Sequence, residues 1–307
     1  MKTIAVIGDS HAWGAGATGY QNQATSDAPL EPTSRWFMPF TIPSFVNILR
    51  NEINSRTDSL AKEMCAVTKL PYRCKTAAEA VRFQLFAEEN NARFSLLVNG
   101  EHMADYCVRA GCEPKEFITV TVKCSGLTEI ELIGDAKLFR MEEYSGEYAV
   151  VNCGFPGSTA EQYLAEHFSN TIVPLEPDYI IVEPCTINDW LLGKTDEQYY
   201  RTACQLLKKA NEMAKTIMVT VSPICGEQTS PMVKGNPEYE WYVHRSVEAA
   251  ERFQVPIADA HKVMLDRLNG LSDEEKFSRM FSDAWHPNDL GHQIYADAIL
   301  NVLGQYL

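Results

Sequence analysis

The sequence contains no long apolar run, no CxxC pair of cysteines and no excess of basic residues. Without a run approaching the ~20 apolar residues of a transmembrane helix, no membrane span is predicted. The 27 Lys and Arg residues are outnumbered by 41 Asp and Glu residues, which gives a net charge of −14. Because nucleic acid and anionic membranes bind basic patches, neither is an expected partner. The charge says little about a small-molecule substrate.

The cysteines and the N-terminus indicate a cellular location. Nine cysteines are present, an odd number, and several lie in apolar, strand-like runs, such as Cys124 in TVTVKC and Cys185 in YIIVEPC. This is typical of buried free thiols in a reducing cytoplasm. An Asp-Ser pair interrupts the first apolar run too early for a signal peptide. We therefore expect a cytoplasmic protein, unless a leader has been trimmed from the sequence.

No metal and no cofactor is expected. Cys107 and Cys112 could pair or bind a metal, but no histidine or further cysteine with ligand spacing lies near them in the sequence. The chain also contains no internal repeat and no low-complexity tract.

Short apolar runs alternate with helical patterns through most of the chain. The runs are apolar on both faces, as buried parallel strands are. The predicted strands cover residues 3–8, 148–154, 178–185, 216–224 and 255–260. The predicted helices begin near Pro43 and at 158–168, 196–214 and 239–253, with a last helix that carries Pro287 in its first turn. This alternation predicts an α/β fold, in which helices cover a doubly wound parallel sheet.

Residues 57–147 break the alternation. Runs such as VRFQLFA, ARFSLLV, EFITVTVKC and TEIELIG are short and strand-like, and turn-forming pairs separate them. VRFQLFA could form a helix, but the alternation of Val81 and Phe83 with polar residues favours a strand. Because a segment of this length needs a fold of its own, we predict two domains. Residues 1–56 and 148–307 form the α/β domain, and residues 57–147 form an inserted, mainly antiparallel β-sandwich module.

Polar groups follow the predicted strands, where a parallel sheet gathers its functional residues. Gly8-Asp9-Ser10 follows the first strand, Asn152-Cys153-Gly154 ends the second, and Thr186-Ile187-Asn188-Asp189 follows the third. The segment SDAWHP near the C-terminus adds Asp283 and His286. A nucleophile, amide donors, an acid and a base therefore fall where the fold would bring them to one rim.

These four blocks resemble the SGNH, or GDSL, hydrolase family, which is named for a Ser, Gly, Asn and His in this chain order. The matching residues are Ser10 in IGDS, Gly154 in NCGFPGST, Asn188 in TIND, and His286 with Asp283 in DAWHP. The resemblance implies a three-layer, flavodoxin-like domain, with the insertion between its first two blocks. Two positions depart from the family pattern: Thr186 replaces a glycine, and His11 replaces the usual small aliphatic residue after GDS.

The residue types themselves suit acyl transfer. A serine hydroxyl is a weak nucleophile until a base takes its proton, and His286 is suited to that near neutral pH. Asp283 can accept the other ring N–H and stabilise the imidazolium. The backbone N–H groups of Ser10 and Gly154 and the side-chain amide of Asn188 could form an oxyanion hole. We therefore predict Ser10, Asp283 and His286 as the catalytic residues.

Each of these residues alone also fits a structural role in a turn, a cap or the core, and only their joint order favours catalysis. Asp9 and Asp189 are predicted to hold their turns, and His292 to pack in the last helix. The candidates for the substrate cleft are His11, Trp13, Trp190 and Trp285, which all lie within three residues of a block residue. Flat rings there could stack on a sugar, but ordinary packing explains the tryptophans equally well.

The leading hypothesis is a serine esterase that cleaves short-chain acyl esters, above all acetyl esters, of a carbohydrate or similar small alcohol. An acyltransferase with the same triad, using a sugar hydroxyl in place of water, is the nearest alternative. A non-catalytic carbohydrate-binding protein is the second alternative. The expected partner is a small-molecule or oligosaccharide ester, and the inserted module could bind glycan, shape the cleft or mediate a homo-oligomer.

Overall fold

The computed structural model describes residues 1–19, 40–87, 91–108, 118–225 and 238–307. The chain divides into two compact units. We name them the α/β unit, comprising Lys2–Tyr20, Thr41–Glu52 and Val150–Leu307, and the strand unit, comprising Met1, Gln21–Phe40 and Ile53–Ala149.

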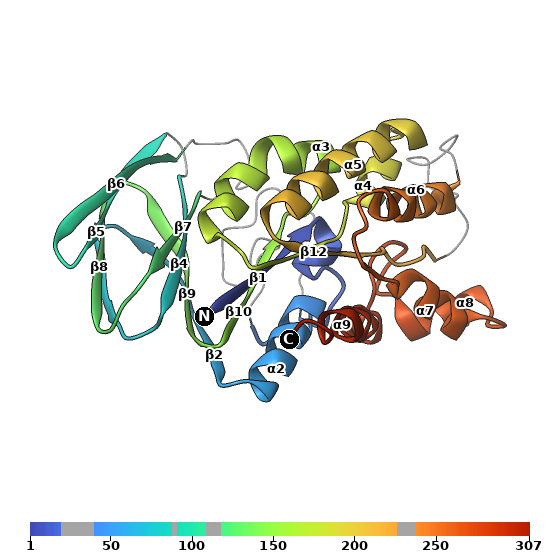
Figure 1. The fold of residues 1–307 in the computed structure, drawn as a ribbon, viewed down its shortest axis with the longest axis horizontal. Helices are drawn as coiled ribbons and strands as arrows, with labels where there is room; N and C mark the ends of the chain where they lie inside the picture. Colours follow the sequence, from blue (N-terminus) through green and yellow to red (C-terminus); the bar gives the residue numbers. More distant parts are fainter. Residues whose placement is uncertain (20–39, 88–90, 109–117, 226–237) are drawn as a thin grey trace. The chain divides into compact units, whose positions relative to one another are not determined.

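A five-stranded sheet forms the centre of the α/β unit (Figure 1). Its strands are β1 (Lys2–Gly8), β10 (Tyr148–Gly154), β11 (Tyr179–Val182), β12 (Lys215–Val219) and β13 (Ile257–Ala258). Their order is β10-β1-β11-β12-β13, and β1, β11, β12 and β13 pair in parallel. Every residue of β10 and β11 is buried, which is why the sequence shows runs that are apolar on both faces.

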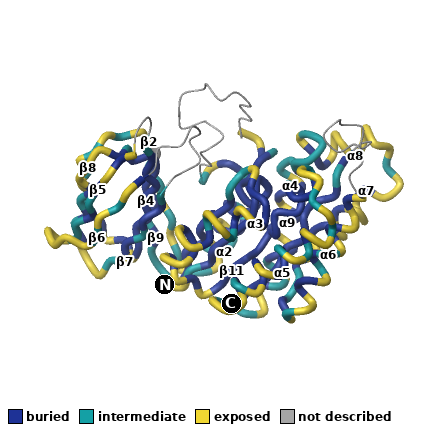
Figure 2. The backbone as a smooth tube through the Cα atoms, turned by 90° about the horizontal axis from the view of Figure 1, so that it is seen from above, coloured by how far each residue is buried: buried dark blue, intermediate teal, exposed yellow. Residues whose placement is uncertain are grey.

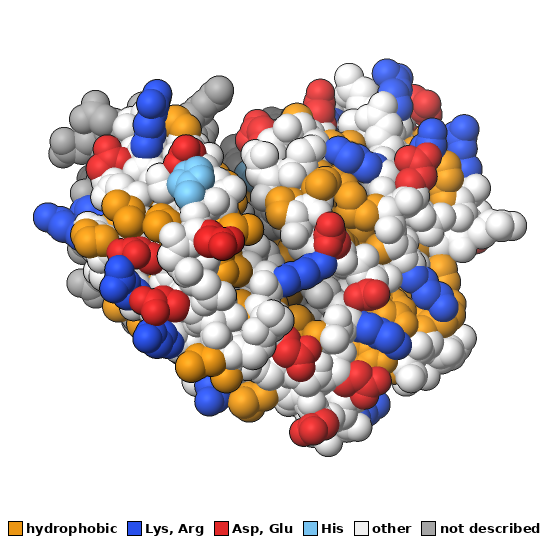
Figure 3. Space-filling view, turned by 60° about the vertical axis from the view of Figure 1, so that its left-hand side comes forward, with side chains coloured by type: hydrophobic (Ala, Val, Ile, Leu, Met, Phe, Trp, Pro, Cys, Tyr) orange, Lys and Arg blue, Asp and Glu red, His pale blue; other side chains and the backbone are white. Residues whose placement is uncertain are grey.

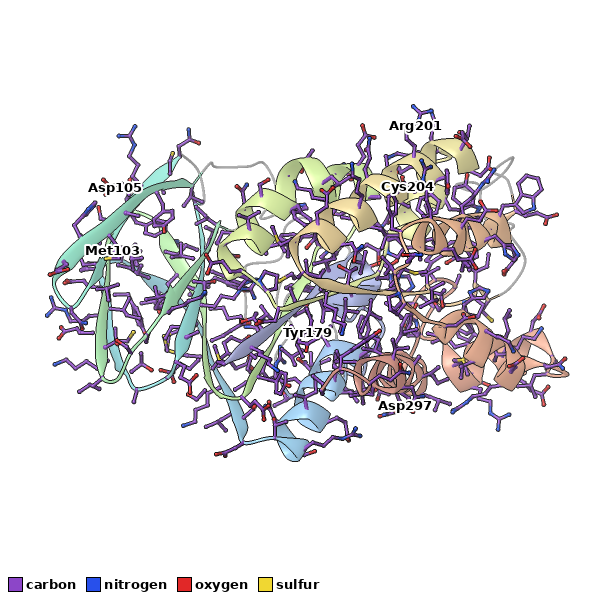
Figure 4. All side chains as sticks on the ribbon, in the orientation of Figure 1. Met103, Asp105, Tyr179, Arg201, Cys204 and Asp297 are labelled. Atoms are coloured by element: carbon purple, nitrogen blue, oxygen red, sulfur yellow. The ribbon has the colours of Figure 1, made fainter. Side chains whose placement is uncertain are left out.

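Helices cover both faces of this sheet. In Figure 4, Tyr179 of the sheet lies between Cys204 on α5 (Asp196–Met213) and Asp297 on α9 (Asp289–Leu303). Figure 2 shows β11 as buried, whereas exposed stretches line α5 and α6. The remaining helices are α1 (Ser10–Trp13), α2 (Phe45–Arg56), α3 (Ala160–Gln162), η1 (Tyr163–Ile172), η2 (Val173–Leu175), α4 (Thr186–Leu191), α6 (Tyr239–Arg252), α7 (Ala260–Leu268) and α8 (Asp273–Met280).

Each predicted strand and helix of the α/β unit is present, but β12 and β13 are shorter than the strands predicted at 216–224 and 255–260. Two of the helices also differ from the prediction. The predicted helix at 158–168 is a short α-helix, α3, that continues as a π-helix, η1. Pro287 precedes α9 instead of lying in its first turn, because Asn288 is the N-cap and accepts the backbone N–H groups of Leu290 and Gly291. The sequence patterns did not predict α1, α4, α7 or α8.

The strand unit contains two four-stranded sheets, in the orders β2-β9-β4-β7 and β3-β8-β5-β6. Their pairings are antiparallel. The bounds are β2 (Ser59–Lys69), β3 (Tyr72–Thr76), β4 (Ala80–Phe86), β5 (Ala92–Val98), β6 (Glu101–Val108), β7 (Ile118–Lys123), β8 (Thr128–Gly134) and β9 (Lys137–Gly146). The segment VRFQLFA therefore forms a strand, as predicted.

One hydrophobic cluster in the strand unit takes residues from both of its sheets, Phe83 and Leu138 from the first and Phe94 and Leu132 from the second. Acidic and basic side chains are interspersed on the face that Figure 3 displays. No described helix is long and apolar enough to cross a membrane. Seven described cysteines are free thiols, and four of these are buried. The alternative Cys107–Cys112 pair falls outside the described residues, because Cys112 does.

Candidate active site

Ser10 lies in the first turn after β1, the strand that stands between β10 and β11. Asp9 caps the short helix α1 by accepting the His11 backbone N–H at 2.9 Å, and Ser10 is the first helical residue. In the sheet, β10 lies on one side of β1, and β11, which follows β10 along the chain, lies on the other side. The carboxyl end of β1 therefore lies at a topological switch point, where the strand order reverses. Ser10 is 8% exposed at this end of the sheet.

His286 and Asp283 lie in the segment between α8 and α9. His286 Nε2 is 3.0 Å from Ser10 Oγ, and His286 Nδ1 is 2.8 Å from Asp283 Oδ2. The other carboxylate oxygen, Oδ1, accepts the backbone N–H groups of Trp285 and His286 at 2.8 and 2.7 Å. The structure therefore brings the three predicted catalytic side chains together in one hydrogen-bonded chain.

The charge on Asp283 suits this arrangement. Burial would raise its pKa, but the hydrogen bonds and charge of His286, with the two backbone donors, outweigh that effect and lower the pKa of Asp283 to about 2. An ionised carboxylate at Nδ1 keeps the proton of His286 on that nitrogen. Nε2 is then free to accept the proton of the Ser10 hydroxyl.

Gly154 does not supply the predicted oxyanion donor. Its N–H already donates to Asn152 Oδ1 at 2.9 Å. A Cβ at this position would lie 2.4 Å from the backbone nitrogen of Trp13, so the glycine is needed for close packing of β10 against α1. The prediction is wrong because the end of β10 turns this N–H toward the protein's own side chain.

An unpaired backbone donor lies three residues later, at Gly157. The residues Phe155-Pro156-Gly157-Ser158 form a turn in which the Ser158 N–H donates to the Phe155 carbonyl at 3.1 Å. Gly157 has a φ of 80°, which with the preceding proline matches a type II turn. Within the described chain the N–H groups of Gly157 and Ser10 donate to no acceptor, and a Cβ on Gly157 would meet nothing within 4 Å. The Pro-Gly pair was the sequence signal for this donor.

Asn188 links this turn to the loop of Ser10. Its Nδ2 donates to Asp9 Oδ2 at 2.9 Å and to the Ser158 carbonyl at 3.1 Å. Both amide hydrogens are therefore engaged, and the predicted third donation to an oxyanion requires the exchange of one of these bonds. Thr186, which replaces the family glycine, is fully buried and bonds the Tyr199 hydroxyl at 2.6 Å.

Of the four residues predicted to line a cleft, only Trp285 is partly exposed. Trp190 is fully buried and packs edge-on against Tyr239 and Trp285, and Trp13 is 6% exposed. His11 is fully buried as well. The cleft prediction is therefore wrong for His11 and Trp190, whose rings are fully buried. For Trp13, which is about as exposed as Ser10 at 8%, it stays a prediction.

Buried carboxyl groups support the loops around Ser10. Asp9 holds its turn as predicted, and Asp189 Oδ2 accepts the Ala160 N–H at 2.8 Å at the start of α3. Glu183, which the sequence patterns did not single out, accepts the Asp9 N–H at 3.1 Å. Burial and the neighbouring Asp9 carboxylate raise the pKa of Glu183 well above its usual value. Among the described residues, no group of three or more His, Cys, Asp or Glu side chains could hold a metal ion.

The family model of the GDSL-like lipase/acylhydrolase family matches residues 138–294, just over half of the chain. The chain belongs to this family. The predicted resemblance to the SGNH, or GDSL, hydrolases is therefore confirmed. The prediction that the protein is an enzyme that hydrolyses esters is confirmed as well. No curated protein sequence matches the chain.

Solved structures resemble this GDSL-family chain over nearly its whole length. An acetylxylan esterase from Geobacillus stearothermophilus, Axe2, has a TM-score of 0.50 at 15% identity, covering 99% of this chain and 94% of that one. A peptidoglycan O-acetylesterase has a TM-score of 0.53 at 13% identity, covering 100% and 91%. The α/β hydrolase LAE5 from the metagenome of Lake Arreo, Spain, has a TM-score of 0.50 at 15% identity, covering 99% and 95%. Identities this low support the α/β fold alone.

Proposed function

We propose that this GDSL-family protein is a serine esterase that cleaves short-chain acyl esters, acetyl esters in particular, of a carbohydrate or similar small alcohol. The observation that carries the proposal is the chain of hydrogen bonds from Ser10 Oγ to His286 Nε2 at 3.0 Å and from His286 Nδ1 to Asp283 Oδ2 at 2.8 Å. A non-catalytic binding protein would not need this nucleophile, base and acid in mutual contact.

The first half of the reaction uses all three side chains. Ser10 Oγ attacks the ester carbonyl carbon while its proton passes to His286 Nε2, and Asp283 stabilises the imidazolium that forms. The carbonyl oxygen becomes an oxyanion, which the N–H groups of Ser10 and Gly157 would receive. The bond from carbon to the alcohol oxygen then breaks, and the alcohol leaves with the proton from His286. The acyl group remains on Ser10.

The second half releases the acid. Water attacks the acyl carbon and gives a proton to His286 Nε2, and a second tetrahedral oxyanion forms at the same donors. The bond to Ser10 Oγ breaks and the hydroxyl takes the proton back. For each turnover, one ester and one water give one alcohol and one carboxylic acid.

For the architecture, we propose that the α/β unit is a three-layer, flavodoxin-like hydrolase domain and that residues 57–147 are an antiparallel β-sandwich inserted into it. The ends of the insertion support this reading, because Ser59 pairs with Gly146 in the β2–β9 register and the Glu147 N–H donates to the Asp58 carbonyl. An insertion whose ends pair can enter a loop without separating the strands of its host.

Turnover of p-nitrophenyl acetate tests the proposed function. Replacement of the nucleophile, Ser10→Ala, should lower kcat by roughly 10⁴-fold or more, as loss of a serine nucleophile does in other hydrolases. Ser246→Ala is the matched control, because it also removes a buried serine hydroxyl, one that bonds only within α6, to the Val243 carbonyl. A folded wild type with no more activity than Ser10→Ala would contradict the proposal.

The sugar part of the proposal rests on Trp285, the partly exposed ring next to His286. Two of the structural relatives are an acetylxylan esterase and a peptidoglycan O-acetylesterase, which favours an acetylated sugar. Trp285→Ala should raise KM for xylose tetraacetate several-fold, in line with the loss of a stacking contact, and affect p-nitrophenyl acetate less. The control is Trp241→Ala, which removes a tryptophan that is 51% exposed on α6. Equal losses on both substrates would count against a sugar.

A further inference from the structure

We propose that His11, the residue after the nucleophile, is a positioning residue: it bridges the loop of Ser10 to the loop of His286 and sets the distance between them. The role rests on the proposed esterase function. His11 Nδ1 lies 3.1 Å from Asp9 Oδ1, and His11 Nε2 lies 2.9 Å from the carbonyl oxygen of Trp285. The ring is fully buried, so water does not compete for either nitrogen.

Both partners of the ring are acceptors. A carboxylate oxygen and a backbone carbonyl each require an N–H from the imidazole, so the bridge has two ends only when both nitrogens carry hydrogen. Ser222 Oγ also lies 3.2 Å from Nε2, as a weaker third contact. In the proposed two-ended bridge, Nδ1 therefore donates to Asp9 Oδ1 and Nε2 donates to the Trp285 carbonyl.

The two ends of the bridge reach the backbone on either side of the reacting atoms. Asp9 precedes Ser10 and caps the helix that Ser10 begins. Trp285 precedes His286, and its own N–H donates to Asp283 Oδ1. A shift of the Trp285 carbonyl would therefore move both the base and the carboxylate that orients it.

Other bonds join the same segments but end further from the chemistry. His292 Nε2 lies 3.0 Å from the Ala15 carbonyl, and the Thr18 N–H donates to Asp289. The His11 and His286 rings are 5.5 Å apart between centroids. Through its other end, the bridge pairs the His11 ring with the fully buried Asp9 carboxyl group.

The charges around the bridge are consistent with this pairing. Burial would raise the pKa of Asp9, but the hydrogen bonds and charge of His11 outweigh it and hold the pKa of Asp9 below its usual value. Burial and the neighbouring Asp9 carboxylate raise the pKa of Glu183 well above its usual value, which is the opposite direction to the shift of Asp9. His292, in contrast, has a pKa lowered to about 3 by burial.

Three substitutions separate the two ends of the bridge. In His11→Gln the side-chain amide nitrogen takes the place of Nε2 and can still donate to the Trp285 carbonyl. In His11→Asn it takes the place of Nδ1 and can still donate to Asp9. His11→Phe keeps the ring volume and loses both bonds. His292→Phe is the matched control, because it removes another buried histidine with a bond to a backbone carbonyl.

On p-nitrophenyl acetate, we expect His11→Phe to lower kcat about 100-fold with little change in KM, as a misplacement of about 1 Å does. His11→Gln should recover much of this loss and His11→Asn little, because the bond to Trp285 positions His286. His292→Phe should lower the melting temperature and leave kcat near the wild-type value. Wild-type kcat in His11→Phe, or equal losses in His11→Phe and His292→Phe, would overturn the positioning role.

Nitrogen-15 NMR of labelled histidines gives a readout without substrate. We expect N–H groups on both ring nitrogens of His11 at neutral pH and on one nitrogen of His292, whose Nδ1 accepts the Phe45 N–H. A single N–H on His11 would overturn the two-ended bridge. The kinetic failures are distinguishable: a wild type as inactive as Ser10→Ala overturns the proposed function together with this role, whereas an active wild type matched by His11→Phe overturns this role alone.

Discussion

The strand unit and the α/β unit both bury charged side chains, and the partners of those charges differ. In the strand unit, Glu142 pairs with Arg82 at 3.1 Å and with Arg140 at 3.0 Å, so opposite charges on β4 and β9 lie against one another. In the α/β unit, the carboxyl groups of Asp9 and Glu183 accept backbone N–H groups in the loops that follow β1 and β11. The first cluster fixes strands, and the second fixes the loops at the edge of a sheet.

This difference shows which buried charges indicate a site. Taking a charge out of water is costly in either unit unless hydrogen bonds and opposite charges satisfy it. Burial alone therefore does not distinguish a structural ion pair from a catalytic group. The cluster of Asp9 and Glu183, here called the α/β cluster, is distinguished by the groups near it. These are the Ser10 hydroxyl and two backbone N–H groups without acceptors among the described residues.

The largest effect is expected where the α/β cluster reaches the reacting atoms. Asp283→Asn replaces the carboxylate that orients His286 and should lower kcat roughly 10⁴-fold, because the wrong tautomer of the imidazole is then favoured. Esterase assays at several pH values check this. A loss of less than tenfold would show that Asp283 is a cap for its own turn and not part of the reaction.

The same variant has a pH signature in stability. The folded-state pKa of Asp283 is lowered to about 2 from 3.8, so its carboxylate stabilises the fold above pH 3.8 and loses this effect as the pH falls through 2. The difference in unfolding free energy between wild type and Asp283→Asn should therefore shrink between pH 4 and pH 2. Urea unfolding across this range measures the difference.

In the strand unit, we expect a substitution of a buried charge to lower stability and leave activity unchanged. Glu142→Gln removes the charge that two buried arginines share and should cost about 3–5 kcal/mol of unfolding free energy. Glu131→Gln is the matched control, since its partner Arg73 is exposed and such pairs contribute little to stability. Urea unfolding gives the stabilities. For the folded protein, kcat on p-nitrophenyl acetate should not change in either variant, and a loss in Glu142→Gln alone would break the comparison.

The sequence patterns predicted strands well where the buried side chains are apolar. The strands of the five-stranded sheet are apolar on both faces and stood out, as did β4, β5, β7 and β8. The sequence patterns missed β2, β3 and β6, and they missed β9, KLFRMEEYSG, where Arg140 and Glu142 are buried as a pair. Glu142 also pairs with Arg82 on β4. A charged residue with a buried partner on its own or a neighbouring strand looks solvent-exposed in a sequence, and only the pairing reveals otherwise.

The candidate site shows the same limit. The order of the blocks and their resemblance to the family were enough to predict Ser10, Asp283 and His286 together. Sheet topology explains only the place of Ser10, which follows β1, because Asp283 and His286 lie between α8 and α9. The order of the blocks could not distinguish Gly154 from Gly157, since that choice depends on the direction of individual N–H groups in a turn. Nor could it predict that the ring of His11 is buried, since the packing of distant loops decides this.

The smallest and sharpest comparison uses two glycines with nearly the same φ. Gly157 has a φ of 80° in the α/β unit and Gly100 has a φ of 82° in the β5–β6 turn of the strand unit, and a Cβ on either would meet nothing within 4 Å. Gly157→Ala and Gly100→Ala should therefore each cost about 1–2 kcal/mol of stability, from the left-handed conformation alone.

Only Gly157→Ala should also lower kcat, by roughly 10-fold or more, because tilting or shielding an oxyanion donor weakens the transition state far more than it weakens the fold. Urea unfolding and p-nitrophenyl acetate turnover of both variants check the two expectations side by side. Gly154→Ala adds a third point, since its Cβ would press on the Trp13 backbone and should reduce stability most. If Gly157→Ala and Gly100→Ala keep the same kcat, the free N–H of Gly157 is a feature of its turn and the oxyanion donors must be sought elsewhere.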